Sequence, residues 1–394
     1  KTTTAHLLGQ LLAHVGRRPA VLGTAGNRLA DGALLSASHT TPDAPELQRL
    51  LARHQRLGGD CVAMEASSHA LAQDRLAGLR IDCAIFTNLT RDHLDFHGDM
   101  DSYAAAKRQL FESLSSSSFA VVNADDPAGE LMARAARERG AHVVSFSTRS
   151  RADLSASRLE VDSKGTRFLL DGMGISRTRV SFPLVGRFNV ENAMAALAAV
   201  LVSGASPSHA LGGLALASAA PGRMQKIEFV SGEFEVLVDY AHTEDALRKV
   251  LAVLREGLSA DGRRRNSSAG RLICVFGCGG DRDAGKRAPM GAAAGSLADV
   301  VVVTSDNPRG ENPQSIIASI EQGLAGTTAQ VHNEPDRRAA IALALRLARR
   351  HDVVLIAGKG HETTQTIGHV VHAFDDRAVA ASLLARAGGA GAST

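Results

Sequence analysis

Polar residues follow two β-branched runs in the first half of the sequence, at positions where they could bind a metal ion. Glu65 ends the run GDCVAME, and the run IDCAIFTN ends at Asn88, shortly before His93. In open parallel sheets, ligands bind beyond the carboxyl ends of the strands. Because Mg²⁺ takes mainly oxygen ligands, often carboxylates and phosphates, Glu65 is a credible ligand. A single acid after a strand often only caps a helix, and a single histidine is more often a capping or core residue.

The sequence begins with Lys1 and Thr2, which match the last two residues of a phosphate-binding loop. In the pattern G-x-x-x-x-G-K-[ST], the lysine reaches the β- and γ-phosphates of a nucleotide and the hydroxyl binds Mg²⁺. The apolar residues from Leu7 to Val15 predict the helix that follows such a loop. On these few residues alone, an ordinary helix start with a threonine cap is the favoured interpretation, so the rest of the chain must decide.

The second half of the sequence places a glycine-rich, charged loop after three strand-like runs. The runs ending VFG, VVVTSD and VLIAG continue into CGGDRDAGKR, NPRGENP and KGHETTQ. Glycine-rich turns let backbone N–H groups approach an anion closely. The loops present Arg282, Asp306, Asn307, Arg309 and Glu362, a mixture of charges that fits a zwitterion such as a free amino acid. A simple turn would explain one such loop, but three at one sheet edge predict a pocket.

Parallel sheets are needed to position these loops, and the hydrophobic pattern predicts them. Strands are expected in the first half at 18–23, 59–65, 81–88, 118–125 and 141–147, with helices near 43–57, 101–114 and 127–139. Strands spaced by helices imply βαβ units and a parallel sheet. Alternation over 154–184 predicts a small antiparallel sheet, and two Ala-rich helices follow at about 189–203 and 207–218. The same α/β rhythm returns after APGRM, with strands at 235–240, 271–277, 298–306 and 351–358 and an exposed polar loop at 261–271.

Composition restricts the class of protein. A chain of 394 residues with 44% hydrophobic and 22% charged residues predicts a globular protein of two domains. A net charge of +3 does not suggest nucleic-acid binding, although a pI near 8.8 fits an anionic ligand. The C-x₃-C pair Cys274 and Cys278 lacks a second Cys/His pair, which favours core or loop thiols over zinc. Apolar runs such as 193–202 are too short to span a bilayer, so a cytoplasmic enzyme without membrane insertion is expected.

Eight motifs then identify a family. They are MEASSHAL, FTNLTRDHLDFHGDMDSYAAAK, GRFNVENAMAA, PGRM, DYAHTEDAL, FGCGGDRDAGKRAPMG, DNPRGENP and GKGHETTQ. In this order, over nearly the whole chain, they resemble the Mur ligases, specifically the MurE type. The resemblance implies an α/β protein with a central P-loop-type ATP-binding domain at 1–220, which has a mainly parallel sheet plus a small antiparallel sheet. A Rossmann-like C-terminal domain that binds the incoming amino acid is expected at 221–394.

The resemblance also implies an ATP-dependent amide ligation in peptidoglycan precursor synthesis. ATP phosphorylates the terminal carboxylate of UDP-MurNAc-L-Ala-D-Glu, and the amino group of the next residue displaces phosphate from the acyl phosphate. The family's phosphate loop reads T-G-T-N-G-K-T-T-T, so Lys1 is expected to be its lysine. The loop glycines and the family's N-terminal domain are not in this sequence, and the chain alone is therefore expected to be catalytically impaired. The expected partners are small-molecule substrates, and a monomer is expected.

Residue roles follow from the matching motifs. The positions expected to bind ATP are Lys1, Thr2, Asn192, Arg223, Asp239 and His242. The UDP-MurNAc-dipeptide is expected at Thr40, Thr41, Ser67, Gln73 and Arg75. The incoming amino acid is expected at Arg282, Asp306, Asn307, Arg309, Gly358 and Glu362. Mg²⁺ is expected at Thr2, Glu65, His93 and Lys107, the last as a carbamylated lysine (N6-carboxylysine), and Lys1, His93 and Lys107 are the expected catalytic residues.

Several alternatives remain at this stage. Without the resemblance, Lys107 would be taken for a solvated helical lysine. Arg309 predicts meso-2,6-diaminopimelate over L-lysine because its planar fork can bind the extra carboxylate, but it could instead merely tie its loop to Glu311. Rival functions are an L-lysine-adding Mur ligase, a folylpolyglutamate synthetase and a fragment that keeps the fold without turnover. Two departures from the family pattern, Glu244 for proline and Thr364 for an aromatic residue, remove no charged catalytic group.

Overall fold

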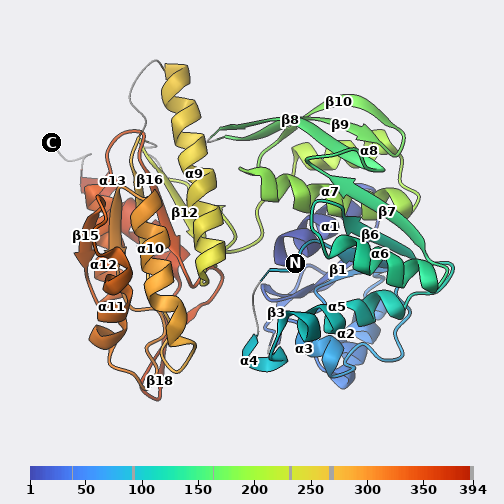
Figure 1. Ribbon diagram of the computed structural model, residues 1–394, viewed down its shortest axis with the longest axis horizontal. Helices are drawn as coiled ribbons and strands as arrows, with labels where there is room; N and C mark the ends of the chain where they lie inside the picture. Colours follow the sequence, from blue (N-terminus) through green and yellow to red (C-terminus); the bar gives the residue numbers. More distant parts are fainter. Residues whose placement is uncertain (38, 91–93, 163, 230–232, 266–269, 391–394) are drawn as a thin grey trace. The chain divides into compact units, whose positions relative to one another are not determined.

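The computed structural model describes residues 1–37, 39–90, 94–162, 164–229, 233–265 and 270–390. The chain divides into two compact units (Figure 1). The first comprises Lys1–Glu160 and Lys164–Ser218, and the second comprises Val161–Ser163 and Ala219–Thr394. Each unit is described by itself below.

The first unit alternates strands and helices before it reaches its antiparallel strands. Its helices are α1 (Thr2–His14), α2 (Ala44–Arg56), α3 (Ser68–Ala72), α4 (Leu94–His97), α5 (Met100–Glu112), α6 (Gly129–Glu138), α7 (Arg187–Val202) and α8 (Pro207–Ala215). Its strands are β1 (Pro19–Gly23), β2 (Gly26–Arg28), β3 (Leu34–Leu35), β4 (Cys61–Met64), β5 (Cys83–Phe86), β6 (Phe119–Asn123), β7 (His142–Ser147), β8 (Leu154–Asp162), β9 (Gly165–Gly172) and β10 (Ile175–Phe182).

These strands form two sheets. One has the order β3-β2-β1-β4, in which β1 and β4 run parallel. The other has the order β10-β9-β8-β7-β6-β5. Strands β5 to β8 are parallel neighbours, whereas β9 and β10 form an antiparallel pair. The antiparallel strands expected over 154–184 are therefore present, but they extend the parallel strands into one sheet because β8 pairs with β7.

Local sequence explains where the helices of this unit begin and how deep they lie. The Asp43 side chain accepts a hydrogen bond from the Glu46 N–H at 2.9 Å, and Asp99 caps α5 in the same way through Ser102. Helix α7 is apolar on nearly every side and is buried over most of its length, from Val190 to Val200. A helix that is hydrophobic all round belongs in a core, and α7 packs against α1 and β6.

The second unit contains one large sheet. Its strands are β11 (Gln225–Lys226), β12 (Glu235–Asp239), β13 (Leu272–Phe276), β14 (Val300–Val303), β15 (Gln330–Asn333), β16 (Val353–Ala357), β17 (Thr364–Ile367) and β18 (Val370–Ala373). Its helices are α9 (Glu244–Arg265), η1 (Ala284–Lys286), α10 (Arg287–Leu297), α11 (Pro313–Glu321), η2 (Gln322–Leu324), α12 (Arg337–Leu347) and α13 (Asp376–Ala390). The large sheet has the order β11-β12-β16-β13-β14-β15 and is parallel from β12 to β15, while β17 and β18 form a separate hairpin.

Helices cover both faces of this sheet. Alternate strand residues such as Val275 and Ile356 share a core with Ile341 of α12 and Ala380 of α13. Helices α9 and α10 pack against each other (Figure 1), and α9 contacts β13 and β16. Because both faces are covered, every residue of β13, β14 and β16 is buried, which explains their continuous apolar sequences.

Two details differ from the sequence-based expectation. The polar stretch expected as a loop from residue 261 is helical as far as Arg265, at the end of α9. The short strands β2, β3, β11, β15, β17 and β18 were not predicted, because strands of two to four residues with exposed positions carry little hydrophobic periodicity.

Candidate active site

Glu65 lies at the centre of a hydrogen-bonded cluster in the first unit. The residue follows β4 directly and is only 3% exposed. Thr2 Oγ1 donates to Glu65 Oε2 at 3.0 Å, and the Thr24 backbone N–H donates to Glu65 Oε1 at 2.8 Å. Thr40 Oγ1 accepts from the Thr24 hydroxyl at 3.0 Å. The start of α1 and the ends of β1 and β4 therefore meet at a set of hard oxygen donors, which is the chemistry that Mg²⁺ prefers.

The residues expected to bind the UDP-sugar-peptide lie beside Glu65. Thr41 Oγ1 donates to the Glu65 carbonyl at 2.7 Å and accepts from the Ser67 N–H at 3.0 Å. Arg75 Nη1 donates to the Thr41 carbonyl at 2.9 Å, and Arg75 Nη2 donates to Gln73 Oε1 at 2.7 Å. The structure thus brings these residues together through hydrogen bonds that also hold the backbone at Glu65.

Asn192 and Lys107, two further residues of this unit that were expected in the site, each contact a different part of the chain. Asn192, on α7, accepts a hydrogen bond from Thr4 Oγ1 at 2.8 Å, which ties α7 to the first turn of α1. Lys107, on α5, donates to the Asn88 carbonyl at 2.9 Å and lies 4.9 Å from the centre of the Tyr103 ring. The third, His93, lies outside the described residues.

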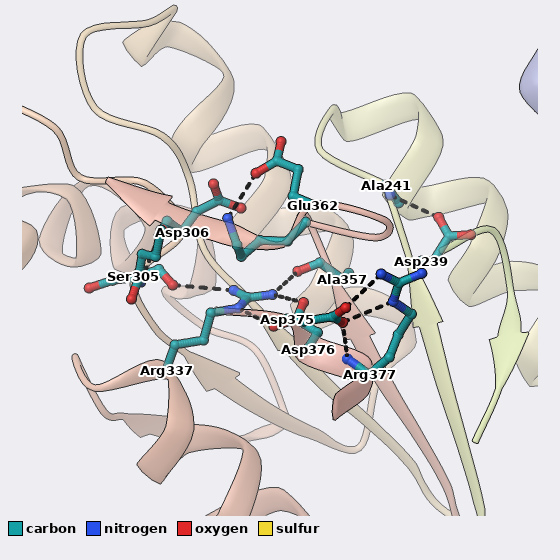
Figure 2. A network of polar contacts seen from close by, with 12 residues as sticks. Asp239, Ala241, Ser305, Asp306, Arg337, Ala357, Glu362, Asp375, Asp376 and Arg377 are labelled. Atoms are coloured by element: carbon teal, nitrogen blue, oxygen red, sulfur yellow. Dashed lines mark hydrogen bonds and ion pairs between the residues drawn. The ribbon is translucent and has the colours of Figure 1, made fainter. Parts of the chain in front are cut away.

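The expected ATP-binding residues of the second unit gather at the end of β12. Asp239 is buried, and it accepts from the Met224 N–H at 2.7 Å. It also accepts from the Ala241 N–H at 2.8 Å (Figure 2). Burial raises the pKa of Asp239, while nearby Arg223 and the two N–H groups oppose that shift. Arg223 lies over the Tyr240 ring at 4.6 Å, and the His242 ring lies 4.5 Å from that ring. The cluster offers an aromatic ring and a cation beside a buried acid.

The three charged loops of the second unit leave one edge of one sheet. Strands β16, β13 and β14 are neighbours in that order and parallel, so their carboxyl ends lie side by side. Asn307 Nδ2 donates to Glu362 Oε2 at 3.0 Å, which links the loop after β14 to the loop after β16. Lys359 Nζ donates to the same Glu362 oxygen at 2.8 Å and to Asn307 Oδ1 at 3.2 Å. The prediction that these loops share one edge is confirmed.

Arg309 is anchored at one end of its guanidinium. Its Nη1 donates to the Gly280 carbonyl at 2.8 Å, which ties it to the loop after β13, while Arg282 is exposed on that same loop. Glu311 does not serve as the anchor that the sequence left open for Arg309. Arg287 donates to both Glu311 oxygens at 2.8 Å, and this pairing holds the pKa of the Glu311 carboxyl below its usual value.

A buried ion pair supports the loops from below. Arg337 and Asp376 are both fully buried, and Arg337 Nη2 lies 2.7 Å from Asp376 Oδ2 (Figure 2). Burial alone would lower the pKa of Arg337, but the charge and hydrogen bond of Asp376, together with the charges of Asp306 and Glu362, outweigh it and the pKa is raised. Arg337 also donates to the carbonyls of Ser305 at 3.2 Å and Ala357 at 2.9 Å. These carbonyls immediately precede Asp306 and Gly358, so one arginine fixes the start of both loops.

Gly358 must be a glycine in this arrangement. Its φ is +114°, a conformation that residues with a side chain rarely adopt. A Cβ at this position would lie 2.7 Å from Asp306 Oδ2. The backbone of Gly358 therefore approaches the Asp306 carboxylate more closely than any other residue type would allow.

Sequence reasoning missed three residues that organise these sites. Thr24 follows β1 directly, so the rule applied to the ends of the other strands would have found it. Lys359 stands within the GKGHETTQ motif, but a lysine with no exposed surface was not expected there. Arg337 carried no sequence signal, since it begins a helix far along the chain from the loops that it supports.

Among the described residues, no group of three or more His, Cys, Asp or Glu side chains is placed to hold a metal ion. Cys274 and Cys278 are free thiols in the core, and burial raises the pKa of each to about 12. In the part of the chain that is described, no helix is long and apolar enough to cross a bilayer.

The fold and these clusters define a class of enzyme. Residues 1–200 match the Mur ligase middle domain, and residues 222–360 match the Mur ligase glutamate ligase domain. The chain belongs to the Mur ligase family. It is therefore an enzyme of the ATP-dependent amide ligase type, and the sequence-based identification of the family is confirmed.

Two curated relatives share nearly half of their aligned residues with this chain. The chain is 44% identical over 388 residues to the UDP-N-acetylmuramoyl-L-alanyl-D-glutamate--2,6-diaminopimelate ligases of Solibacter usitatus and of Chromobacterium violaceum. Each match covers 98% of this chain and 75% of the relative. A solved structure of a ligase with the same name is 38% identical, with a TM-score of 0.68, and the match covers 98% of this chain and 77% of that one.

More distant structures share the fold alone. Mycobacterium tuberculosis folylpolyglutamate synthase complexed with ADP is 20% identical with a TM-score of 0.69, and the match covers 92% of this chain and 86% of that one.

Proposed function

We propose that the protein joins meso-2,6-diaminopimelate to UDP-MurNAc-L-Ala-D-Glu in an ATP-dependent reaction of peptidoglycan precursor synthesis. The observation that carries this proposal is 44% identity over 98% of the chain to relatives named for this reaction. The joined loops of the second unit support it, since Asp306, Asn307, Arg309 and Glu362 offer charges of both signs to a zwitterion.

The reaction has two steps in the proposed mechanism. A carboxylate oxygen of the dipeptide attacks the γ-phosphorus of ATP, the bond to the bridging oxygen breaks, and ADP leaves. The neutral amino group of diaminopimelate then attacks the acyl carbon and loses a proton, and phosphate leaves with the former carboxylate oxygen. ATP and the UDP-linked dipeptide both carry negative charge, so cationic groups are needed around the reacting atoms.

The cluster around Glu65 suits the phosphate end of ATP and its metal ion. The donor set fits Mg²⁺, because a buried carboxylate and the Thr2 hydroxyl are hard oxygens within 3.0 Å of each other. Mg²⁺ bound to phosphates offsets their charge. Lys1, next to Thr2 in sequence, would contact the phosphates, and Asn192 is held against α1 through Thr4.

In the second unit, the Asp239 cluster has chemistry that suits a nucleotide. Arg223 and His242 both lie against Tyr240, so they form one surface of charged and aromatic groups. Aromatic faces and cations favour binding of a flat, electron-rich base.

Lys107 would serve as a carbamate. Carbon dioxide would convert its ammonium into an anion, which could help to hold a cation near the acyl phosphate. The Lys107 ammonium lies over the Tyr103 ring and donates a hydrogen bond to the Asn88 carbonyl. These two contacts hold the side chain in one orientation. His93 is assigned as a further metal ligand on the family motif alone.

The remaining assignments concern the residues that contact the other two substrates and the location and oligomeric state of the protein. Thr40, Thr41, Ser67, Gln73 and Arg75 would contact the UDP-sugar-peptide, in keeping with their position around Glu65. Arg282 and Gly358 would contact the amino acid from the loops after β13 and β16. A cytoplasmic location is proposed, because ATP and the nucleotide-linked substrate are cytoplasmic molecules, and a monomer remains the expectation from the family resemblance alone.

An isotope experiment tests this mechanism directly. The full-length protein is supplied with ATP, diaminopimelate and UDP-MurNAc-L-Ala-D-Glu labelled with ¹⁸O in its terminal carboxylate. We expect the tripeptide product, ADP, and phosphate that carries one ¹⁸O atom for each turnover. Formation of AMP and pyrophosphate, or of unlabelled phosphate with the tripeptide, would contradict an acyl phosphate route.

A further inference from the structure

Lys359 is a fully buried cation next to the candidate amino-acid pocket. Its side chain has no exposed surface, whereas the Glu362 side chain with which it pairs is 31% exposed. The ammonium lies 2.8 Å from Glu362 Oε2 and 3.2 Å from Asn307 Oδ1. It therefore lies on the inner side of the two residues that would face the ligand.

The loops do not depend on Lys359 alone to stay joined. Asn307 Nδ2 still reaches Glu362 Oε2 at 3.0 Å, and the Thr366 N–H donates to Asn307 Oδ1 at 2.9 Å. Lys359 contributes a positive charge in direct contact with Glu362, in addition to the charge of Arg337, which also interacts with Glu362. A buried charge of this kind acts over a longer range than a neutral hydrogen bond, because the surrounding protein screens it less than water would.

We propose that Lys359 is a positioning residue that also sets the charge balance of the amino-acid pocket and so favours diaminopimelate over lysine. The inference rests on the proposed function. At neutral pH diaminopimelate carries two carboxylates and two ammonium groups, with a net charge of zero. L-Lysine lacks one carboxylate and has a net charge of +1. Asp306 and Glu362 bring two negative charges to this pocket and Arg282 and Arg309 bring two positive ones, so Lys359, in contact with Glu362, adds a positive charge that disfavours the more cationic amino acid.

Three variants are expected to change the preference for diaminopimelate over lysine in different directions. Lys359→Met, a neutral side chain of similar length, leaves Glu362 uncompensated, so the ratio of kcat/KM for diaminopimelate to that for lysine should fall about tenfold. Glu362→Gln leaves Lys359 uncompensated, so the same ratio should rise even if both activities fall. In the double variant the ratio should return close to that of the wild type.

A matched control separates charge balance from stability. Arg271 forms an ion pair with Asp352 at 2.8 Å beside the start of β13, at the opposite end of that strand from the charged loops. Arg271→Met should lower the thermal midpoint without changing the amino-acid ratio. Calorimetric binding of each amino acid to the full-length protein provides a second readout that does not require turnover.

The outcomes are distinguishable. Equal losses with both amino acids in Lys359→Met, or a ratio in Glu362→Gln that does not rise, would overturn the role of Lys359. If Lys359→Met does not fold, the sign of the change in Glu362→Gln alone decides. A wild-type protein without diaminopimelate activity would overturn the proposed function itself.

Discussion

Arg309 is the residue that most directly separates the two candidate amino acids. A guanidinium carries five N–H donors, and in the described chain Arg309 uses Nη1 to reach the Gly280 carbonyl at 2.8 Å. The loop after β13 thus holds one side of the fork, and the other donors can grip a carboxylate. With lysine in the pocket this charge would lose its partner, and an unpaired desolvated charge is costly.

Arg309→Ala should therefore reduce activity with diaminopimelate far more than activity with lysine. A site built around a required group can discriminate by about 10⁴-fold against an analogue that lacks it, which sets the upper range of the loss. The measurement is kcat/KM for each amino acid in the full-length protein. Arg255→Ala, which removes an arginine bound to Asp299 and the Leu297 carbonyl, is the control. Equal losses with both amino acids would reduce Arg309 to a structural role.

Lys107 is tested by chemical rescue. If its carbamate helps to hold a cation, Lys107→Ala should lower kcat by about 10²–10³-fold, the usual cost of one well-placed charge stabiliser. Small carboxylates added to the assay should restore part of the activity, because they can occupy the space that the carbamate filled. Near-normal turnover by the variant would remove Lys107 from the mechanism.

At the scale of single residues, the sequence predicted the polar residues that are expected to contact ligands. It did not predict the buried cations that hold those residues in position. Glu65, Asn307 and Glu362 follow strands, so their positions were predictable from the strand pattern. Lys359 and Arg337 are buried cations whose partners are distant in sequence or set by the loop conformation. No local pattern encodes such a partner, so only the folded chain reveals it.

At the scale of elements, the loop after β16 depends on a backbone conformation that only glycine adopts easily. Gly358→Ala should lower stability by about 1–3 kcal/mol for the backbone strain and should also displace Asp306, since the new Cβ would lie 2.7 Å from its carboxylate. We therefore expect a raised KM for the amino acid with a smaller change in KM for ATP.

Gly326→Ala is the matched control for this prediction. Gly326 also has a positive φ, +76°, but a Cβ there would meet nothing within 4 Å. It should show the strain in denaturant unfolding without the change in amino-acid KM. The same change in KM in both variants would argue against the contact between Gly358 and Asp306.

The pair formed by Arg337 and Asp376 should dominate the stability of the second unit. Arg337→Met leaves Asp376 buried and unpaired, at a cost of about 3–5 kcal/mol. The Arg248–Glu244 pair on α9, with side chains 48% and 45% exposed, offers a contrast. Arg248→Met should cost less than about 1 kcal/mol. Similar unfolding free energies for the two variants would show that the buried pair does not contribute more to stability than the exposed pair.

The elements themselves were largely predictable, and their pairing was less so. Buried strands such as β13 and β16 are continuous apolar runs, and helices such as α2 have clear caps, so both carry strong local patterns. The distribution of strands over sheets depends on which edges meet. Strand β8 pairs with β7 and thereby joins the antiparallel strands to the parallel ones. This pairing is determined by tertiary structure, and no local sequence pattern predicts it.

At the scale of the whole molecule, the family identity explains why the chain contains two separate sets of polar clusters. The first unit holds the oxygen-rich cluster around Glu65, and the second holds the joined loops of mixed charge. Ligation needs an activated carboxylate and an amine, so each set matches one half of the proposed chemistry.

The most direct test of this account is amino-acid-dependent phosphate release from the full-length protein. ATP, Mg²⁺ and UDP-MurNAc-L-Ala-D-Glu are held constant, and meso-2,6-diaminopimelate, L-lysine and other amino acids are compared one at a time. The account predicts rapid release with diaminopimelate, little with lysine, and a tripeptide product of the corresponding mass. A preference for lysine, or phosphate release that does not depend on any amino acid, would contradict it.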